Sequence, residues 1–213
     1  MAIVVNSTGR GRGRPRDLEK RQAILDVAAR LFIERGIAAT TMELVAAEAS
    51  VSKMTVYAHF PDKPALMKAA FGQNIGALRL PELVGKPDLE ASREALIAFG
   101  ATLVSFLTRP EIVRGGGLMA AASNEHPDLA ATFYAAGPAA MLAKVADFLR
   151  SLNDRKLIAV DDPELAAEQM IAAWLGQSQL RIGLGLAGPP SAEAIERRVR
   201  FATETMLFAW SAR

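Results

Sequence analysis

One segment of the chain, residues 40–66, restricts the fold more than any other. It reads TTMELVAAEASVSKMTVYAHFPDKPAL. Thr40 and Glu43, three residues apart, predict a capping box that opens a first short helix. After a tight turn, Ser52 is placed to cap a second helix. Two short helices joined by a tight turn predict a helix-turn-helix, which places its second helix in the major groove of DNA.

The second helix of this segment has an apolar face and a polar face. Val56 and Phe60 lie four residues apart and therefore share the side that we expect to be buried. The other side chains suit phosphates and base edges. We expect Thr41 and Lys63 to contact phosphates, and the remaining predicted contacts with double-stranded DNA are Ser52, Lys53, Met54, Thr55, Tyr57 and His59.

Charge is distributed unevenly along the chain. Residues 1–68 contain 11 Lys and Arg against 7 Asp and Glu, whereas residues 69–213 contain 14 against 16. Residues 11–16 read GRGRPR and resemble the core of an AT-hook. An arginine-rich tail is often only a solvated end. Beside a helix-turn-helix, however, residues 1–16 are predicted to form a flexible basic arm whose Arg12, Arg14 and Arg16 contact DNA.

The composition excludes several classes of protein. With 213 residues, 51% of them hydrophobic, the chain can bury a sizeable core. It contains no cysteine, which excludes disulfides, thiolate nucleophiles and Cys-ligated metals. The N-terminal apolar run is too short for a signal-peptide core, and no apolar run reaches the roughly 18 residues of a membrane span. We therefore expect a cytoplasmic protein that does not enter a membrane.

Helical periodicity extends along the whole chain. Besides the two short helices, we expect helices at 17–35, 62–79, 88–108, 112–123, 127–152, 163–186 and 191–212. The core-facing stripe expected in the first of these is Leu18, Ile24, Leu25, Ala28, Leu31 and Phe32. Gly115-Gly116-Gly117 predict a break in 112–123, and Pro138 predicts a kink or a break in 127–152. The predicted fold is all-α with about nine helices: a helix-turn-helix domain at 17–65 and a helical bundle at 66–213.

Residues 18–71 resemble the DNA-binding domain of the TetR family of bacterial transcriptional regulators. The matching positions are Arg21-Gln22-Ala23-Ile24-Leu25, Ala28-Ala29-Arg30-Leu31-Phe32, Gly36, Val51-Ser52, Val56-Tyr57, His59-Phe60 and Lys63. Three positions depart from the pattern. Ser50 stands where the family usually has glycine, Met54 stands where a small residue is common, and Pro64 stands where glutamate is favoured. If position 50 needs a positive φ, serine costs about 1 kcal/mol there.

Residues 109–149 and 160–176 resemble the AefR-type C-terminal domain found in one branch of that family, from which Gly115–Gly117 depart. The resemblance implies an effector pocket within the bundle and a dimer interface formed by the last two helices. Residues expected to line the pocket are Phe99, Leu103, Phe106, Met119, Phe133, Met141, Met170, Trp174 and Gln177, although the simpler interpretation of any single apolar one is that it belongs to the core. The apolar stripe expected at the interface is Ile195, Val199, Ala202, Met206 and Trp210, which could instead dock onto its own chain.

Other motifs carry little weight. Residues 183–188 fit GxGxxG, but they follow a helix and precede two prolines, so the strand–turn–helix context of a dinucleotide site is missing. Asp161 and Asp162 precede Pro163 and fit a helix N-terminus. His59 and His126 have no second His or Cys at ligand spacing. We therefore expect no cofactor, no metal and no catalytic residue.

Two hypotheses of different classes remain. The first is a transcriptional regulator, most simply a repressor, that binds a double-stranded DNA operator as a homodimer and is released by a small apolar effector. The second is a small all-α enzyme or carrier in which the helix-turn-helix resemblance is incidental. The second needs a catalytic constellation, and the sequence shows none. A non-specific architectural DNA binder would need a more basic body than residues 69–213 provide. The regulator is favoured.

Overall fold

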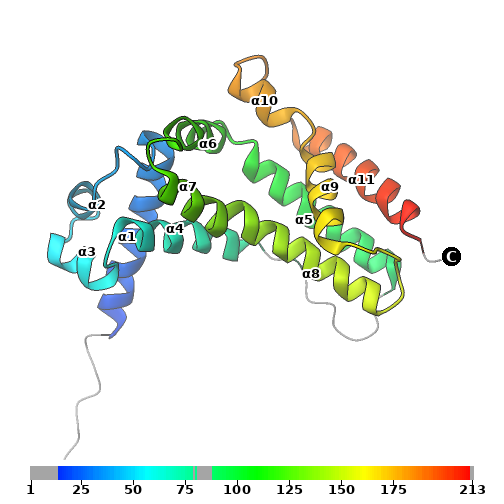
Figure 1. The fold of residues 1–213 in the computed structure, drawn as a ribbon, viewed down its shortest axis with the longest axis horizontal. Coiled ribbons are helices and arrows are strands. Elements are labelled where there is room, and N and C mark those ends of the chain that lie inside the picture. The colour runs from blue at the N-terminus through cyan, green and yellow to red at the C-terminus, as the bar shows by residue number, and fades with distance from the viewer. Residues whose placement is uncertain (1–13, 79, 81–87, 212–213) are drawn as a thin grey trace, which may run out of the picture.

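The structure, a computed structural model, describes residues 14–78, 80 and 88–211. Every regular element in these ranges is a helix, and the molecule is elongated, with its N-terminal helices at one end and its last helix at the other (Figure 1). The elements are α1 (Arg14–Arg35), α2 (Met42–Glu48), α3 (Lys53–His59), α4 (Lys63–Ala77), α5 (Leu89–Leu107), α6 (Pro110–Ala122), α7 (Pro127–Tyr134), the π-helical turn η1 (Ala135–Ala139), α8 (Ala140–Asp154), α9 (Pro163–Leu175), α10 (Ser178–Gly183) and α11 (Ala192–Ala209).

The all-α prediction is confirmed, and two of the nine expected helices are subdivided. The helix expected at 163–186 ends at Gly176, whose φ of 51° lies in the left-handed region, and α10 continues in a new direction. The helix expected at 127–152 contains η1, which includes Pro138. Because proline lacks an N–H, the α-helical hydrogen bond is interrupted there, and the chain forms a π-helical turn at the position where the sequence predicted a kink or a break.

The break expected at Gly115–Gly117 is wrong, because α6 runs through all three glycines. Gly115 is needed for a close approach instead: a Cβ atom on it would lie 3.2 Å from Cα of Ile33. The glycine therefore lets α6 cross close to the backbone of α1. The axis of α6 is bent by 67° from that of α5, which turns the chain back toward the N-terminal helices.

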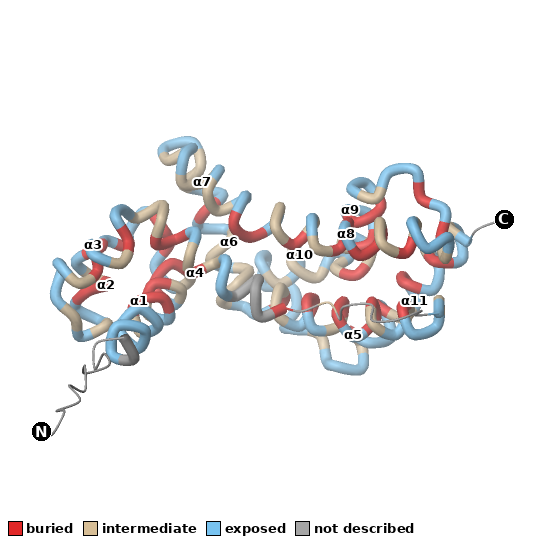
Figure 2. The backbone as a smooth tube through the Cα atoms, turned by 90° about the horizontal axis from the view of Figure 1, so that it is seen from below, coloured by how far each residue is buried: buried red, intermediate tan, exposed pale blue. Residues whose placement is uncertain are grey.

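The N-terminal helices enclose a core of their own. Its fully buried side chains include Ile24, Leu31, Phe32, Val45, Val56, Leu66 and Met67, and Met119 of α6 joins the same cluster. Figure 2 shows these buried segments on the inner sides of α1 and α4. Leu18 does not belong to it: with 61% of its surface exposed, its predicted place in the core stripe is wrong. The domain boundary expected at residue 65 falls inside α4, which contributes to this core through Ala70.

The cap of α2 differs from the predicted capping box. Thr40 is fully buried, and its hydroxyl donates to the carbonyl of Gly36 at 2.9 Å. The N-cap is Thr41, whose Oγ1 accepts from the backbone N–H of Leu44 at 3.1 Å. Threonine is a favoured N-cap residue, so the sequence alone allows either of these two neighbours to cap the helix. Thr40 is buried and bonds elsewhere, and the exposed Thr41 is the cap.

The C-terminal core lies among α5, α8, α9 and α11. Its centre is Trp174, which is fully buried and whose Nε1–H donates to Oγ1 of Thr203 at 2.9 Å. The ring of Phe99 meets the ring of Trp174 edge-on, with centroids 6.3 Å apart. This arrangement anchors α11 to α9 and α5, so the last helix is part of the protomer's own core.

Gly100 should be the most sensitive glycine of this core. A Cβ atom there would lie 2.7 Å from Cγ1 of Val199 and 2.9 Å from Cε2 of Trp174. We expect Gly100→Ala to lower the free energy of unfolding by about 1–3 kcal/mol, as overpacked core sites do. Gly72→Ala is the matched control, since nothing lies within 4 Å of its Cβ position in α4. Denaturant unfolding of both variants measures this, and a Gly100→Ala variant as stable as the wild type would contradict the packing of α11.

The continuous helical run from Pro127 to Asp154 is long and apolar enough to cross a membrane by length and composition alone. This differs from the sequence-based expectation that the chain contains no membrane-length apolar segment. The helices of a folded core meet the same criterion, and this run packs against α9 and places Val145, Leu149 and Leu152 in the C-terminal core. Packing within the protein buries 28% of the apolar window of this run.

Candidate DNA-binding surface and ligand cavity

Helix α3 presents its polar face to solvent, at one end of the molecule (Figure 1). Oγ of Ser52 accepts from the backbone N–H of Thr55 at 3.1 Å and starts the helix. Val56 and Phe60 are buried, as predicted, and hold α3 against the N-terminal core. Met54 is 79% exposed and Tyr57 is 40% exposed. Neither of these large side chains is buried in the core, so both are accessible to a partner.

The turn before α3 stores a small strain. Ser50 adopts a φ of 53°, in the left-handed region that favours glycine. This is the position at which the family resemblance calls for glycine, and serine adopts the positive φ there. The left-handed conformation costs a serine about 1 kcal/mol.

Lys53 lies at the start of the exposed face of α3. Its Nζ is 2.5 Å from Oε1 of Glu43 and 5.6 Å from the centroid of the Tyr57 ring. The hydrogen bond and the opposite charge raise the pKa of Lys53 and lower the pKa of Glu43. Because both side chains are more than half exposed, this ion pair is weak, and a DNA phosphate could replace Glu43 as the partner of Lys53.

Lys63 has a structural position that conflicts with the predicted phosphate contact. Its Nζ donates to the carbonyls of Ile37 at 2.9 Å, Ala38 at 3.1 Å and Thr40 at 3.1 Å. An ammonium group has three hydrogens, so these bonds use all of them. Partial burial lowers the pKa of Lys63. Lys63 therefore fixes the loop between α1 and α2 to the start of α4.

His59 also differs from its predicted role at base edges. Only 12% of its side chain is exposed, and its Nε2 lies 3.2 Å from Oδ1 of Asp17. The ring thus connects the end of α3 to the first turns of α1. Thr41 and Ser52 serve as N-caps, and their contact with DNA stays a prediction.

The expected basic arm is shorter than predicted, because α1 begins at Arg14 rather than at Asp17. Arg12 lies outside the described residues. Arg16 is exposed in the first turns of α1. Arg14 begins the same helix.

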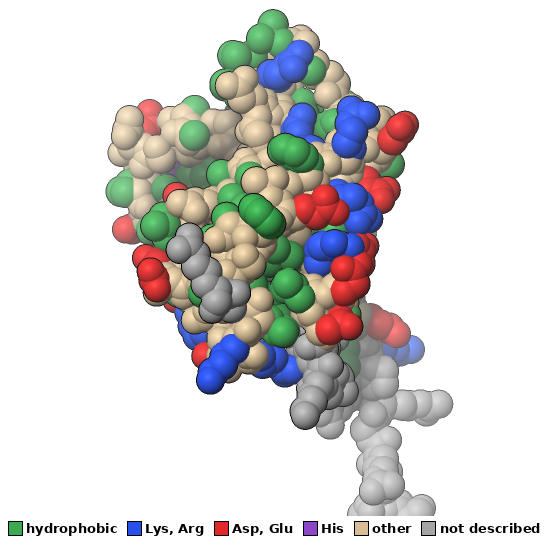
Figure 3. All heavy atoms as spheres, turned by 90° about the vertical axis from the view of Figure 1, so that its right-hand side faces the viewer, with side chains coloured by type: hydrophobic (Ala, Val, Ile, Leu, Met, Phe, Trp, Pro, Cys, Tyr) green, Lys and Arg blue, Asp and Glu red, His purple; other side chains and the backbone are tan. Residues whose placement is uncertain are grey.

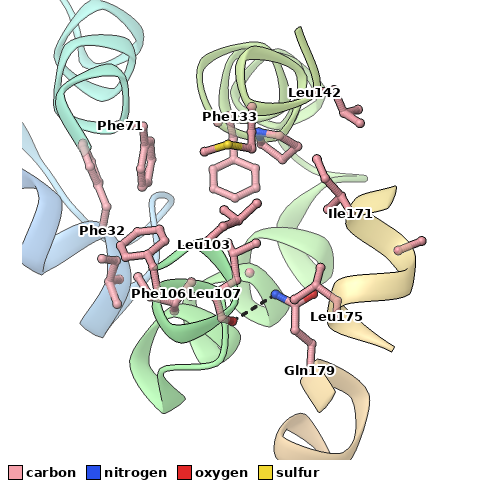
Figure 4. A pocket seen from close by; sticks show the side chains of 18 of the residues that line it. Phe32, Phe71, Leu103, Phe106, Leu107, Phe133, Leu142, Ile171, Leu175 and Gln179 are labelled. Carbon is pink, nitrogen blue, oxygen red and sulfur yellow. Dashed lines mark hydrogen bonds between the residues drawn. The ribbon is translucent and has the colours of Figure 1, made fainter. Parts of the chain in front are cut away.

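A cavity of about 390 Å³ lies between the N-terminal helices and the C-terminal bundle. Four aromatic rings, those of Phe32, Phe71, Phe106 and Phe133, point into it from different helices (Figure 4). Phe71 stacks on Phe32 and meets Phe133 edge-on, with ring centroids 6.0 Å and 5.2 Å apart. The remaining lining residues are Ile33, Ile37, Leu103, Leu107, Ile112, Gly115, Gly116, Gly137, Pro138, Met141, Leu142, Glu168, Ile171, Ala172, Leu175 and Gln179. The wall is thus almost wholly apolar and fits a small apolar molecule.

Four of the nine predicted pocket residues line this cavity: Leu103, Phe106, Phe133 and Met141. The other five do not. Phe99, Met170 and Trp174 are buried in the C-terminal core, Met119 is buried in the N-terminal core, and Gln177 is an exposed N-cap of α10. Sequence reasoning missed Gln179, two residues further on, and it also missed the contribution of α1 and α4. In the sequence, Phe32 and Phe71 look like ordinary core residues of the DNA-binding domain.

The apolar stripe predicted at the dimer interface belongs to the protomer's own core. Ile195, Val199 and Ala202 are buried within the chain. Met206 and Trp210 are half-buried and pack against the same cluster. That part of the prediction is therefore wrong, since the stripe faces α5 and α9 and is not free for a second copy.

A second apolar face of α11 is exposed. Phe201 is 72% exposed and Phe208 is 83% exposed, and seven residues apart they lie on the same side of the helix. Figure 3 views this end of the molecule and shows hydrophobic side chains gathered in its middle, with acidic and basic side chains along one side. Leu180 of α10 and Leu165 of α9 are also at least half exposed. Exposed large apolar side chains on one side of a helix make that side a candidate interaction surface.

Among the described residues, no group of three or more His, Cys, Asp or Glu side chains could hold a metal ion. The two sites that emerge are therefore the exposed face of α3 and the apolar cavity. Phe32, Ile33, Ile37 and Phe71 connect them, because these residues line the cavity and belong to α1, to the loop after it and to α4.

Known proteins share both parts of this arrangement. Residues 94–212 match the family described as AefR-like transcriptional repressor, C-terminal domain, and residues 24–70 match the bacterial regulatory proteins of the tetR family. Among curated proteins, the chain is 36% identical over 100 residues to the uncharacterized HTH-type regulator YdeS of Bacillus subtilis and 40% identical over 85 residues to the HTH-type regulator AcrR of Shigella flexneri. These alignments span 47% and 37% of the chain, and 48% and 39% of the relatives' own lengths.

Solved structures match over most of the chain. The flavonoid-responsive regulator FrrA is 31% identical, with a TM-score of 0.69, over 92% of this chain and 98% of that protein. A TetR-family regulator of Mesorhizobium loti is 26% identical, with a TM-score of 0.71, over the same shares. Members of the family are regulators and not enzymes, and they bind operator DNA and form dimers. With both of its parts matched, the chain belongs to the TetR family of bacterial transcriptional regulators and carries an AefR-like C-terminal domain.

Proposed function

We propose that this protein is a homodimeric, cytoplasmic repressor that binds its operator through α3 and is released by a small apolar effector in the cavity. The observation that carries the proposal is the cavity wall. Phe32 and Ile37 come from the DNA-binding domain, whereas Leu103 and Met141 come from the C-terminal bundle. A molecule in the cavity therefore touches both parts, and its binding depends on how they are placed relative to each other.

The effector would act by shifting a population between two domain arrangements. Ile37 lines the cavity with its side chain, and its carbonyl accepts from Lys63 at the start of α4. Phe71 on α4 lines the same cavity. A ligand that fits better when these groups move apart changes the angle of the helix-turn-helix and hence the separation of the two α3 helices in the dimer. Operator half-sites require a separation near one DNA turn, about 34 Å, and the loss of affinity equals the ligand's preference for the misaligned state.

The dimer is proposed to form through the exposed face of α11. Phe201 and Phe208 have no contact that would bury them within the chain, and the family forms dimers. An isologous interface buries the same residues on both copies. With α11 fixed to the C-terminal core by Trp174 and Thr203, this pairing would transmit the domain angle to the spacing of the two DNA-binding domains.

The chemistry of the cavity favours an aromatic effector. Four phenylalanine rings surround it, which suits a flat ring system that can stack or meet rings edge-on. The similar regulator FrrA is described as flavonoid-responsive, which is consistent with an aromatic ligand class.

Two glycines of α6 provide a test of the proposal. Gly116 lines the cavity, its neighbour Gly117 does not, and a Cβ atom at either position meets nothing within 4 Å.

An operator is first selected from random duplexes with the purified protein. Aromatic compounds are then screened for release of the protein from that operator, measured by fluorescence anisotropy. We expect Gly116→Leu to bind the operator normally and to resist release, while Gly117→Leu behaves as the wild type. Equal release of both variants would contradict the cavity as the effector site.

The basic arm should contribute electrostatically. We expect deletion of residues 1–13 to weaken operator binding and to flatten its salt dependence, because each phosphate neutralised contributes about −0.9 to the slope of log affinity against log salt. Affinities measured at several salt concentrations give this slope, and circular dichroism checks that the deletion leaves the fold intact. An unchanged slope would show that Arg10 and Arg12 do not contact DNA.

A further inference from the structure

A groove between α8 and α9 adjoins the apolar cavity. Its lining residues are Ala139, Leu142, Ala143, Ala146, Asp147, Arg150, Asp162, Glu164, Leu165 and Glu168. Two of them, Leu142 and Glu168, also line the apolar cavity. The cavity and the groove therefore share a wall, and a ligand seated in the cavity can extend past Glu168 toward the groove.

Glu168 is the one charged residue on the cavity wall among the residues that the structure describes. The other acids of the groove already have partners. Arg150 forms ion pairs with both Asp147 and Glu164, and Asp162 caps α9 by accepting from the backbone N–H of Leu165 at 2.9 Å. Glu168 has no ion pair or hydrogen bond from its side chain to another described residue. Glu168 is exposed, at the edge that the cavity shares with the groove, so its carboxylate is a solvent-accessible negative charge without a protein partner at the end of an apolar cavity.

The second polar group on the wall also presents an acceptor. Nε2 of Gln179 donates to the carbonyl of Leu107 at 3.1 Å (Figure 4). Its Oε1 is left as the acceptor end of the amide. Arg109, whose guanidinium carbon lies 5.4 Å from the ring centroid of Phe106, is not among the lining residues. The polar groups of the wall therefore accept hydrogen bonds, and a carboxylate or phosphate ligand would find no basic side chain there.

We propose that the effector is an aromatic cation, whose rings occupy the cavity among Phe32, Phe71, Phe106 and Phe133 and whose positive group lies against Glu168. This inference rests on the proposed function, with the cavity as the effector site, and refines the apolar effector to one whose apolar rings carry a positive group at one end. A cation suits the wall in two ways: it is attracted to the carboxylate of Glu168, and its charge can interact with the faces of the neighbouring rings. An anionic ligand would repel Glu168 and lack a partner.

The test compares two dyes that differ by one methyl group and one charge. The cation is 4-(4-dimethylaminostyryl)-N-methylpyridinium, and its neutral counterpart is the unmethylated pyridine, used at a pH at which it is unprotonated. Binding to the purified wild-type protein is measured by dye fluorescence without DNA. We expect the cation to bind tighter than the neutral dye. Glu168→Gln should weaken the cation about fivefold, the scale of a partly exposed ion pair, and leave the neutral dye unchanged.

A charge-neutral variant separates a local contact from an overall charge effect. Glu168→Gln combined with Gln169→Glu keeps the net charge and moves the carboxylate to an exposed residue outside the cavity wall. We expect this double variant to bind the cation as weakly as Glu168→Gln alone. If it binds the cation as the wild type does, or if Glu168→Gln weakens both dyes equally, the inference is overturned.

The same experiment distinguishes this inference from the proposed function. In one outcome, the neutral dye binds the wild type but not Gly116→Leu, and the cation binds no tighter than the neutral dye. The cavity would then remain a ligand site, and only the inference that the effector is positively charged would be refuted. If neither dye binds the wild type, both the ligand class and the cavity's role are contradicted.

Discussion

Replacing Phe201 and Phe208 together by Asp should convert the protein from a dimer to a folded monomer that no longer holds its operator. Both side chains are more than 70% exposed within the protomer, so the substitution removes no contact of the protomer core. If Phe201 and Phe208 form the centre of an isologous interface, the substitution removes both side chains from both subunits. Buried aromatic anchors commonly contribute 2 kcal/mol or more each to binding. The dimer dissociation constant should therefore rise by at least about 100-fold.

The loss of operator binding follows from geometry. A monomer carries one α3 and can contact only one half-site at a time, so it loses the gain from simultaneous contact with both. Tyr134→Asp is the matched control, because Tyr134 is another large aromatic residue, 56% exposed, on the distant helix α7. Sedimentation velocity at micromolar protein and operator titration measure both effects. A Phe201→Asp, Phe208→Asp variant that remains dimeric would show that the interface lies elsewhere.

Replacing Tyr57 by Ala should weaken operator binding by about 1–3 kcal/mol, the range of a good contact with a base edge. Tyr57 is 40% exposed, and its ring lies beside Lys53, so its removal also frees that lysine from a neighbour that orients it. The fold should be little affected, because the buried anchors Val56 and Phe60 remain. Thermal unfolding of the variant checks this.

Phe60→Ala is the contrasting variant for the same helix. It should lower the free energy of unfolding by about 3–5 kcal/mol, since it removes a buried aromatic side chain. The expected pattern is a binding defect with normal stability for Tyr57→Ala and a stability defect for Phe60→Ala. Normal operator affinity in Tyr57→Ala would mean that α3 does not read DNA with this face.

The sequence predicts those features of the fold that depend on neighbouring residues, such as the start of a helix. Ser52, Asp88 and Ser191 each cap a helix where the sequence placed a helix start, because a cap depends on residues within one turn. The errors lie where tertiary contact overrides the local signal. Gly115 reads as a helix break in the sequence, yet it serves the close crossing of α6 over α1.

The candidate sites were predictable only in part. Val56 and Phe60 are buried and Tyr57 and Met54 exposed, because the periodicity of a short helix separates its two faces. Helix α11 is different, since it carries two apolar faces: the stripe through Val199 is longer, and it is the one that the core uses. Periodicity shows that a face is apolar, and it does not show which partner covers the face.

The residues that line the cavity could also be predicted only in part from the sequence. Phe106 and Phe133 could be proposed as wall residues because they lie in the C-terminal bundle. Phe32 and Phe71 could not, since nothing in the sequence indicates that the N-terminal core opens toward the bundle. The same cavity is lined by Pro138 of the π-helical turn and by Leu107 and Ile112 on either side of the bend between α5 and α6, residues that only the assembled fold brings together.

The central claim is that the cavity and the DNA-binding surface are coupled, and one measurement tests it most directly. The dissociation constant of a cavity-binding compound is measured with the free dimer and again with the dimer saturated by its operator. Linkage requires that a compound which lowers operator affinity by a given factor is itself bound more weakly by the same factor in the presence of operator. We predict a dissociation constant at least about fivefold higher with operator, the lower end of typical coupling. Equal dissociation constants with and without operator would contradict the account.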